Sequence, residues 1–169
     1  SYGLMSFAEI DSLSTSTPDV MLTWKLLKRE FSGLVPHIKH DDSDTCSDPR
    51  VNRFALRPDN YHSMDAWLSR FFYNSVIYGA PALYMPRDAD GLINGLVNVD
   101  GSTIFTLIDE NANPPAPPAP AYLQIIYGIP FGFASTEQLW YKPSELQIKS
   151  EYGWALAESA NLPVRLLNN

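Results

Sequence analysis

The sequence predicts an α+β fold in which helices pack on a small antiparallel sheet. Apolar residues recur at helical spacing in two stretches before Gly79. After Gly79, short β-type runs are separated by glycine-containing turns, and strands do not alternate with helices as they would in a parallel sheet. A chain of 169 residues is long enough for one domain with a substantial core.

The composition is that of a globular protein with an acidic surface. Apolar residues make up 45% of the chain, which excludes a disordered chain, and the net charge is −7. A free-standing nucleic-acid-binding protein normally carries a basic face. The cluster of Lys25, Lys28 and Arg29 instead fits the solvated face of a helix. The single cysteine, Cys46, excludes an internal disulfide framework and favours a reducing compartment.

Targeting signals are not predicted. No apolar run approaches the roughly 18 residues needed to span a bilayer. The first residues lack a basic region followed by an apolar one, so we expect no signal peptide.

The chain is expected to begin with an extended arm and then a helix. Residues 1–15 carry apolar side chains without a persistent period, which indicates an arm that packs on another part of the protein or on a neighbour. A hydroxyl residue at Ser16 or Thr17, then Pro18, predicts a helix start. Gly33 predicts its end. Between these signals four apolar residues recur at helical spacing: Val20, Trp24, Leu27 and Phe31.

Further helices follow a predicted short strand over residues 34–40 and a polar loop over residues 40–49. A short helix is predicted over residues 49–56, ending before a proline turn at Arg57-Pro58. Ser63 is the predicted cap of a second long helix, which ends at Gly79. This helix carries a broad apolar stripe: Met64, Trp67, Leu68, Phe71, Phe72, Ser75 and Val76.

The remaining segments are predicted to be β. Residues 81–100 form a hairpin that turns at Asp90-Gly91, and Asp100-Gly101 leads into a third strand over residues 102–109. Prolines between 114 and 120 predict an extended, stiff strut. Further strands are predicted over residues 121–128 and 138–143, separated by a turn around residues 128–132 and a helix-initiating set at residues 135–137.

The residues capable of chemistry do not form a recognisable site. His37, His40 and His62 are far apart, and a metal site would need the carboxylates of Asp41, Asp42 and Asp44 to converge. The spacing favours a solvated loop. Residues 88–91 resemble the start of a calcium loop but lack the later ligands, and Ser102 has no base nearby. We therefore predict no catalytic residue, cofactor site or metal site.

Aromatic side chains are abundant, and they are predicted to pack in the core or at subunit contacts. Stacking on single-stranded nucleic acid is the alternative, but no basic groove accompanies them. The set is Trp24, Trp67, Phe71, Phe72, Tyr73, Tyr78, Tyr84, Tyr122, Tyr127 and Trp140.

An ordered series of landmarks over residues 57–153 resembles the portal proteins of tailed bacteriophages. The landmarks are the RPD turn before a capped helix, the YGAPALY junction, the DADG hairpin, the VDGSTI turn, the PPAPAYLQIIYG segment and EQLWYKP. The resemblance implies a portal wing-like fold over residues 17–153, preceded by an arm over residues 1–16. Residues 154–169 follow as a segment of unclear assignment.

This resemblance implies a structural role without catalysis. Portal subunits form a ring, usually a dodecamer, at one capsid vertex, and the ring is the conduit for DNA packaging and ejection. The implied partners are other copies of the chain, the major capsid protein, the head–tail adaptor or neck protein, terminase during packaging, and the double-stranded DNA that passes through the channel. The implied location is the virion, and the host cytoplasm during assembly, with no membrane partner. No DNA-binding residue is assigned.

The sequence departs from the portal pattern after Tyr152-Gly153. The family places an SPVE-like motif there, whereas this chain continues with WALAESANLPVRLLNN. A wing-region fragment, an abridged chain and a reduced portal-like protein are the open interpretations. Two other functions remain as alternatives: a non-enzymatic adaptor or peptide-binding module that uses a sheet edge, and a small hydrolase, which would require clustered acid and base groups.

Overall fold

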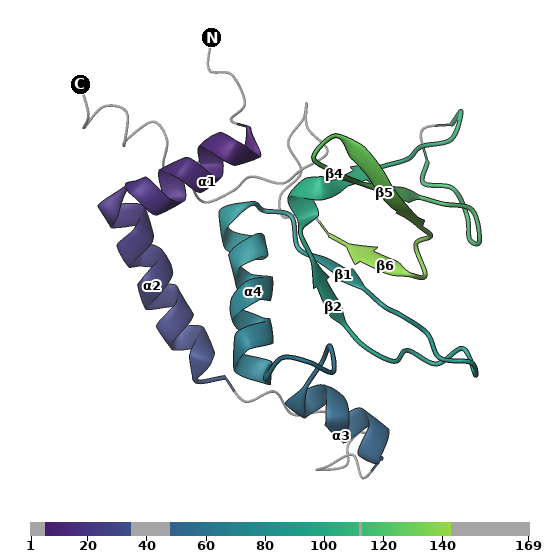
Figure 1. The fold of residues 1–169 in the computed structure, drawn as a ribbon, viewed down its shortest axis with the longest axis horizontal. Helices are drawn as coiled ribbons and strands as arrows, with labels where there is room; N and C mark the ends of the chain where they lie inside the picture. Colours follow the sequence, from purple (N-terminus) through teal and green to yellow (C-terminus); the bar gives the residue numbers. More distant parts are fainter. Residues whose placement is uncertain (1–5, 35–47, 112, 143–169) are drawn as a thin grey trace.

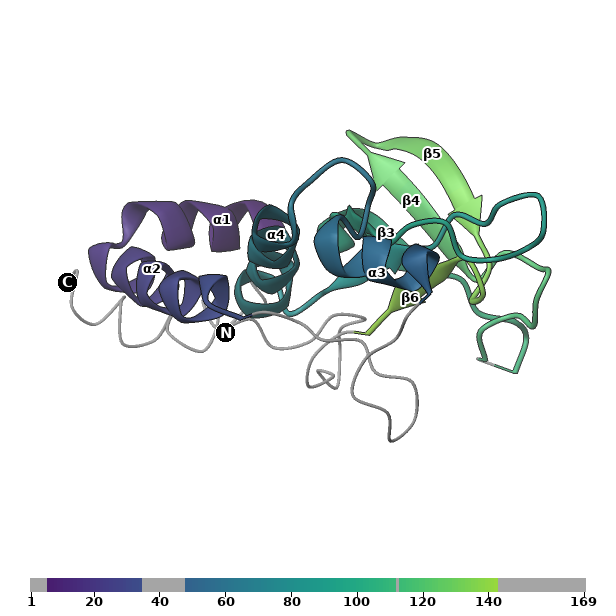
Figure 2. The same cartoon turned by 90° about the horizontal axis from the view of Figure 1, so that it is seen from below.

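The computed structural model describes residues 6–34, 48–111 and 113–142. These residues form a layer of helices and two three-stranded antiparallel sheets, which confirms the α+β prediction but divides the single expected sheet into two. Figure 1 shows the order of the layers from α2 through α4 to the sheets. Figure 2, turned by 90°, shows the same order, with α1 and α2 on the side of α4 away from the strands.

Helix α1 (Phe7–Ser16) occupies most of the segment that we expected to be extended. The Ser6 hydroxyl accepts a hydrogen bond from the Glu9 N–H, and the Glu9 carboxylate accepts one from the Ser6 N–H at 2.7 Å. This reciprocal capping box starts a helix despite the weak apolar period. Ile10 of α1 is buried against Ile77, so this part of the arm packs within the protein.

Helices α2 (Pro18–Ser32), α3 (Pro49–Leu56) and α4 (Met64–Ile77) confirm the predicted helices. Their predicted end signals are also present. The Ser63 hydroxyl accepts from the Ala66 N–H, and Gly79 has a φ of 62° after the last turn of α4. Aromatic pairs join α2 to α4, with Trp24 packing edge-on against Tyr73 and Phe31 stacking on Phe72. The predicted strand over residues 34–40 and the loop after it lie, apart from Leu34 and the last loop residues, outside the described residues.

The first sheet contains β1 (Ala82–Tyr84), β2 (Val97–Val99) and β6 (Leu139–Tyr141), with β1 in the middle. The pairing of β1 with β2 confirms the predicted hairpin. One face of this sheet contacts α4, because Trp140 packs against Phe71 and the Asn98 amide bonds to α4. The other face carries Ala82 and Leu139 into the second sheet. The first sheet is therefore covered on both faces.

The second sheet contains β3 (Ile104–Thr106), β4 (Tyr122–Ile126) and β5 (Ile129–Ala134), with β4 in the middle. A single 3-10 turn, η1 (Gly101–Thr103), takes the place of the first residues of the predicted third strand. Strand β5 differs from the turn that we predicted over residues 128–132. Tyr127 and Gly128 both have positive φ, so these two residues alone reverse the chain. A turn, not a helix start, follows β5 and leads into β6.

The proline-rich segment is a loop within one domain, as predicted, but it is not a straight strut. It joins β3 to its antiparallel neighbour β4, and the Leu107 N–H donates to the Ala121 carbonyl at 2.8 Å. The two ends of the segment therefore lie side by side. A further bond from the Ala119 N–H to the Ala116 carbonyl closes a turn among the prolines. Because β3 and β4 are antiparallel, the chain must reverse its direction between them, and the turn at residues 116–119 contributes to that reversal.

Candidate functional site

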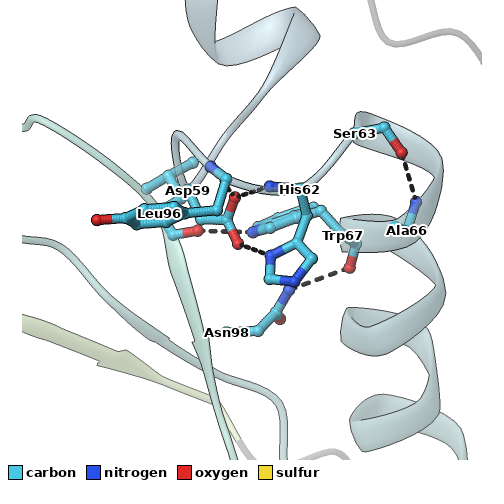
Figure 3. Close-up of polar contacts among 8 residues, drawn as sticks. Asp59, His62, Ser63, Ala66, Trp67, Leu96 and Asn98 are labelled. Carbon is cyan, nitrogen blue, oxygen red and sulfur yellow. Dashed lines mark hydrogen bonds and ion pairs between the residues drawn. The ribbon is translucent and has the colours of Figure 1, made fainter.

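The first polar cluster lies where the turn before α4 meets β2 (Figure 3). The Asp59 carboxylate accepts hydrogen bonds from the N–H groups of Tyr61 and His62, and its other oxygen contacts His62 Nδ1. Burial opposes the charged form of Asp59, but the bonds from His62 and Tyr61 outweigh it and lower the pKa of this carboxyl below its usual 3.8. The carboxylate thus holds the turn in place.

The same region fixes α4 to β2. The Trp67 Nε1–H donates to the Leu96 carbonyl at 2.6 Å, and the Asn98 amide donates to the Trp67 carbonyl at 3.0 Å (Figure 3). Leu96 in turn donates its N–H to the Pro58 carbonyl. Each of these three hydrogen bonds involves at least one backbone group, and each joins two different parts of the fold. The cluster containing His62 joins the turn before α4 to α4 and to the segment that leads into β2.

The other residues capable of chemistry in the described chain also have structural partners. The Asp88 carboxylate accepts from the N–H groups of Asp90 and Leu92, which supports the predicted hairpin turn. The Ser102 hydroxyl donates to the Asp100 carboxylate, which caps η1. No group of three His, Cys, Asp or Glu residues in the described part of the chain could hold a metal. His37, His40, Asp41, Asp42 and Asp44 lie outside the described residues.

Most of the predicted aromatic contacts are internal, as expected for core packing. Trp67 stacks on Phe71, and Tyr122 packs edge-on against Tyr141. On the helical side, the hydroxyls of Tyr73 and Tyr78 both donate to Asp11 Oδ1 and so tie α4 to α1. Burial, together with this carboxylate, raises the pKa of Tyr73 to about 12. Tyr127 differs from this group, because it is almost wholly exposed.

The feature that stands apart is the face of the second sheet directed away from the first, which we call the outer sheet face. Strand register aligns Phe105 with Leu123 and Leu123 with Phe133, and it pairs Ile125 with Pro130. The opposite face carries Ile104, Tyr122 and Ala134 into the core. The outer sheet face consists of Phe105, Leu123, Ile125, Pro130 and Phe133.

An outer face of this kind is unusual in an antiparallel sheet. Residues that face water normally alternate as polar groups with the apolar residues of the core face. Here Phe133 is 65% exposed, and Phe105 is also exposed. The extra residue of a bulge in β5, Phe131, is 74% exposed. No charged side chain occurs between residues 111 and 136. Large uncovered apolar surfaces mark interaction sites.

A cavity of about 360 Å³ lies between the two sheets beside this surface. Most of its walls are apolar, and Phe131 and Phe133 of β5 border it together with Tyr84, Ile104 and Leu139. Burial raises the pKa of Tyr122, so its hydroxyl stays neutral. The cavity lacks converging acid and base groups among the residues that line it, and its other polar wall residue, Gln124, donates its amide N–H to Thr103 Oγ1 at 3.0 Å.

A second uncovered apolar surface lies on α2, on the side away from α4, and we call it the outer helix face. Val20 and the half-buried residues Trp24, Leu27 and Phe31 face inward. Leu22 and Leu26, one turn apart, are 56% and 49% exposed. Lys25 and Arg29 lie at helical positions beside them. Figure 1 places α2 at the end of the molecule opposite β5.

Comparison with solved structures establishes the class of fold. The chain resembles a chain from the neck of an empty gene transfer agent (GTA) particle computed with C6 symmetry, with a TM-score of 0.79 and 14% identity. That match covers 99% of this chain and 45% of the other. A chain from the neck of the native GTA particle, computed with C12 symmetry, gives a TM-score of 0.67 at 13% identity. That match covers 99% of this chain and 46% of the other.

A chain from the virion of the native GTA particle gives a TM-score of 0.72 at 14% identity, covering all of this chain and 47% of the other. This chain therefore spans less than half the length of each of these three chains. No protein-family model matches it, and neither does any curated protein. Within residues 6–34, 48–111 and 113–142, no helix has the length and apolar character to cross a membrane. The class is an α+β fold shared with chains of GTA particles.

Proposed function

We propose that this chain is a structural subunit of a ring in a phage-like virion and forms the wing of a portal at the capsid vertex. The observation that carries the proposal is the likeness of fold over 99% of the chain to neck chains of particles with cyclic symmetry. The portal-like order of landmarks over residues 57–153 supports it independently. The two uncovered apolar faces supply surface for contacts between subunits.

In this role the chain acts mechanically. Copies of the chain, twelve in the portal resemblance, surround a channel for DNA, while the major capsid protein and the head–tail adaptor or neck protein contact the ring from outside. Terminase contributes the ATP hydrolysis during packaging, so the subunit itself needs no catalytic group. A net charge of −7 limits the number of cations that can hold the phosphate backbone, which favours sliding of double-stranded DNA. The subunit resides in the virion, and in the host cytoplasm before assembly.

The test is the mass of the purified chain in solution. Mass photometry across a range of concentrations should show a species that is a fixed multiple of the 18.9 kDa chain, and negative-stain microscopy should show rings. A monomer under all conditions would contradict ring assembly by this chain.

A second function, a peptide-binding adaptor, is favoured by one observation. Among the described residues, β5 pairs only with β4, so its other edge can accept an added strand. The adaptor function predicts a monomer that binds one extended peptide. Its amide signals along β5 would shift on titration with the peptide, and no ring would form.

A further inference from the structure

We propose that a pocket between α3 and the hairpin that joins β1 to β2 binds a protein segment in which a carboxylate lies next to an apolar side chain. We call it the arginine pocket, because Arg50, Arg53 and Arg87 all line it. The inference goes beyond the proposed ring, since the pocket belongs to a single copy of the chain.

The arginine pocket has a volume of about 370 Å³ and walls that hydrogen bonds hold in place. On the hairpin side, the Asp88 N–H donates to the Leu92 carbonyl at 2.9 Å. On the α3 side, Arg53 Nη2 donates to Asn94 Oδ1 at 2.8 Å and so joins the helix to the hairpin. The pocket is therefore formed before a ligand arrives, which lowers the entropic cost of binding.

Two of the three guanidinium groups have no carboxylate partner among the described residues. Arg50 is paired with Asp48, at 3.1 Å between Nη2 and Oδ2. Arg53 and Arg87 donate instead to backbone and amide oxygens, and Arg87 Nη1 bonds to the Gly91 carbonyl at 2.7 Å. These bonds fix each guanidinium while leaving several of its five N–H donors for a ligand.

The charge balance of the arginine pocket fits a single carboxylate. Asp88 is the other anion in its wall, and its carboxylate accepts two N–H groups of its own turn. The Arg50–Asp48 pair is neutral, so Arg53 and Arg87 exceed Asp88 by one positive charge. A guanidinium fork matches the two oxygens of a carboxylate. A DNA backbone is disfavoured, because its closely spaced phosphates would bring several negative charges against Asp48 and Asp88.

The rest of the wall is apolar, and part of it is open to water. Val51 and Phe54 line the α3 side, and Leu92 and Ile93 line the hairpin side. Leu92 is 48% exposed and Ile93 is 38% exposed. An apolar side chain beside the carboxylate would cover this surface. A segment of a protein suits such an open site better than a free small molecule, whose pocket normally encloses most of the ligand.

Saturation-transfer difference NMR on the full chain tests the site, because it detects weak ligands of monomers and rings alike. The probe is the capped tripeptide leucyl-glutamyl-phenylalanine amide, and the matched probe has glutamine in place of glutamate. We expect the glutamate probe to bind about tenfold more tightly, since the glutamine probe lacks the charge-assisted hydrogen bonds to the guanidinium groups.

Substitutions in the pocket should change the dissociation constant in opposite directions. Arg53→Gln and Arg87→Gln should each weaken binding of the glutamate probe about tenfold. Arg70→Gln is the matched control, because Arg70 is an exposed arginine of α4 outside the pocket. Asp88→Asn keeps an oxygen that accepts the N–H groups of its turn and removes one negative charge, so it should tighten binding about threefold.

Four results would overturn the inference. One is equal binding of the two probes. Another is binding that the arginine substitutions leave unchanged, as expected of a peptide that adds to the edge of β5 through its backbone. Octanoate binding more tightly than the glutamate probe would indicate a small apolar acid as the ligand. A short DNA duplex that displaces the probe and depends on Arg53 and Arg87 would indicate a nucleic-acid site.

The expected result is weaker binding in both arginine variants, no change in Arg70→Gln and tighter binding in Asp88→Asn. None of these outcomes depends on ring formation, which the mass of the chain in solution measures separately.

Discussion

The two sheets of this protein have similar residues but different surroundings. The first sheet lies between α4 and the second sheet, and its residues contact other elements on both faces. The second sheet packs on the first with one face only, and its outer face leaves Phe105 and Phe133 exposed. The two sheets therefore differ in how many of their apolar faces are covered: both faces of the first sheet, but one face of the second.

This comparison separates residues that stabilise the fold from residues available for assembly. Around the first sheet, polar groups such as Asp59 and the Trp67 indole have defined partners, and small residues allow close approach of the backbone. Around the outer sheet face, apolar groups take the place of polar ones, and Phe105 and Phe133 are exposed while Leu123 and Ile125 are half-buried. Substitutions in the two regions should therefore have opposite consequences for stability and for association.

The largest expected effect is at a glycine beside the first sheet. A Cβ at Gly101 would lie 1.7 Å from the Ala80 carbonyl oxygen, so Gly101→Ala must displace backbone. We expect a loss of about 4 kcal/mol in the free energy of unfolding, measured by denaturant titration. Gly132→Ala on β5 is the control, because no atom lies within 4 Å of its Cβ. A similar loss at Gly132 would contradict the distinction between the regions.

The next effect compares a buried apolar residue with an exposed one. Ile77 is 1% exposed, and Ile77→Ala should cost about 3 kcal/mol through lost burial and a cavity. Phe133→Ala removes more atoms but should change unfolding by less than about 0.5 kcal/mol, because this side chain already faces water. Thermal unfolding of the two variants at a concentration where the protein is monomeric provides the measurement. Equal destabilisation would mean that the outer sheet face belongs to the core.

A smaller effect concerns alkaline pH on the helical side. Because the folded-state pKa of Tyr73 is raised to about 12 from 10, its neutral form stabilises the folded protein below pH 10. This contribution should disappear progressively as the pH rises from about 10 to about 12. Tyr73→Phe should cost about 1 kcal/mol at neutral pH and reduce the alkaline slope. An unchanged slope would exclude Tyr73 as its source. In the Tyr73→Phe variant, Tyr78 still donates its hydroxyl to Asp11 and accounts for the dependence of stability on alkaline pH that remains.

Much of the fold could be predicted from local signals. The boundaries of α2, α3 and α4 follow from caps and apolar spacing, and the β1–β2 hairpin follows from Asp90-Gly91. Helix α1 was missed because its apolar period is weak, although Ser6 and Glu9 form a capping box that is visible in the sequence. Strand β5 was missed because its proline and glycine are typical of a turn.

The candidate surface could not be predicted for a different reason. The absence of charge between residues 111 and 136 is visible in the sequence and could have indicated a contact surface. Which apolar residues face outward depends on the register of three strands and on the bulge at β5. A shift of one residue reverses the faces, so the outer sheet face is defined only by the folded structure.

The central claim is that the outer sheet face serves assembly and not folding. The most direct test measures oligomeric mass and unfolding temperature on the same preparation of Phe133→Asp. We expect the assembled species to be lost while the unfolding temperature of the monomer matches that of the unsubstituted monomer, and Leu56→Asp should change neither. A large fall in the unfolding temperature of the monomer, with the oligomeric mass retained, would contradict the claim.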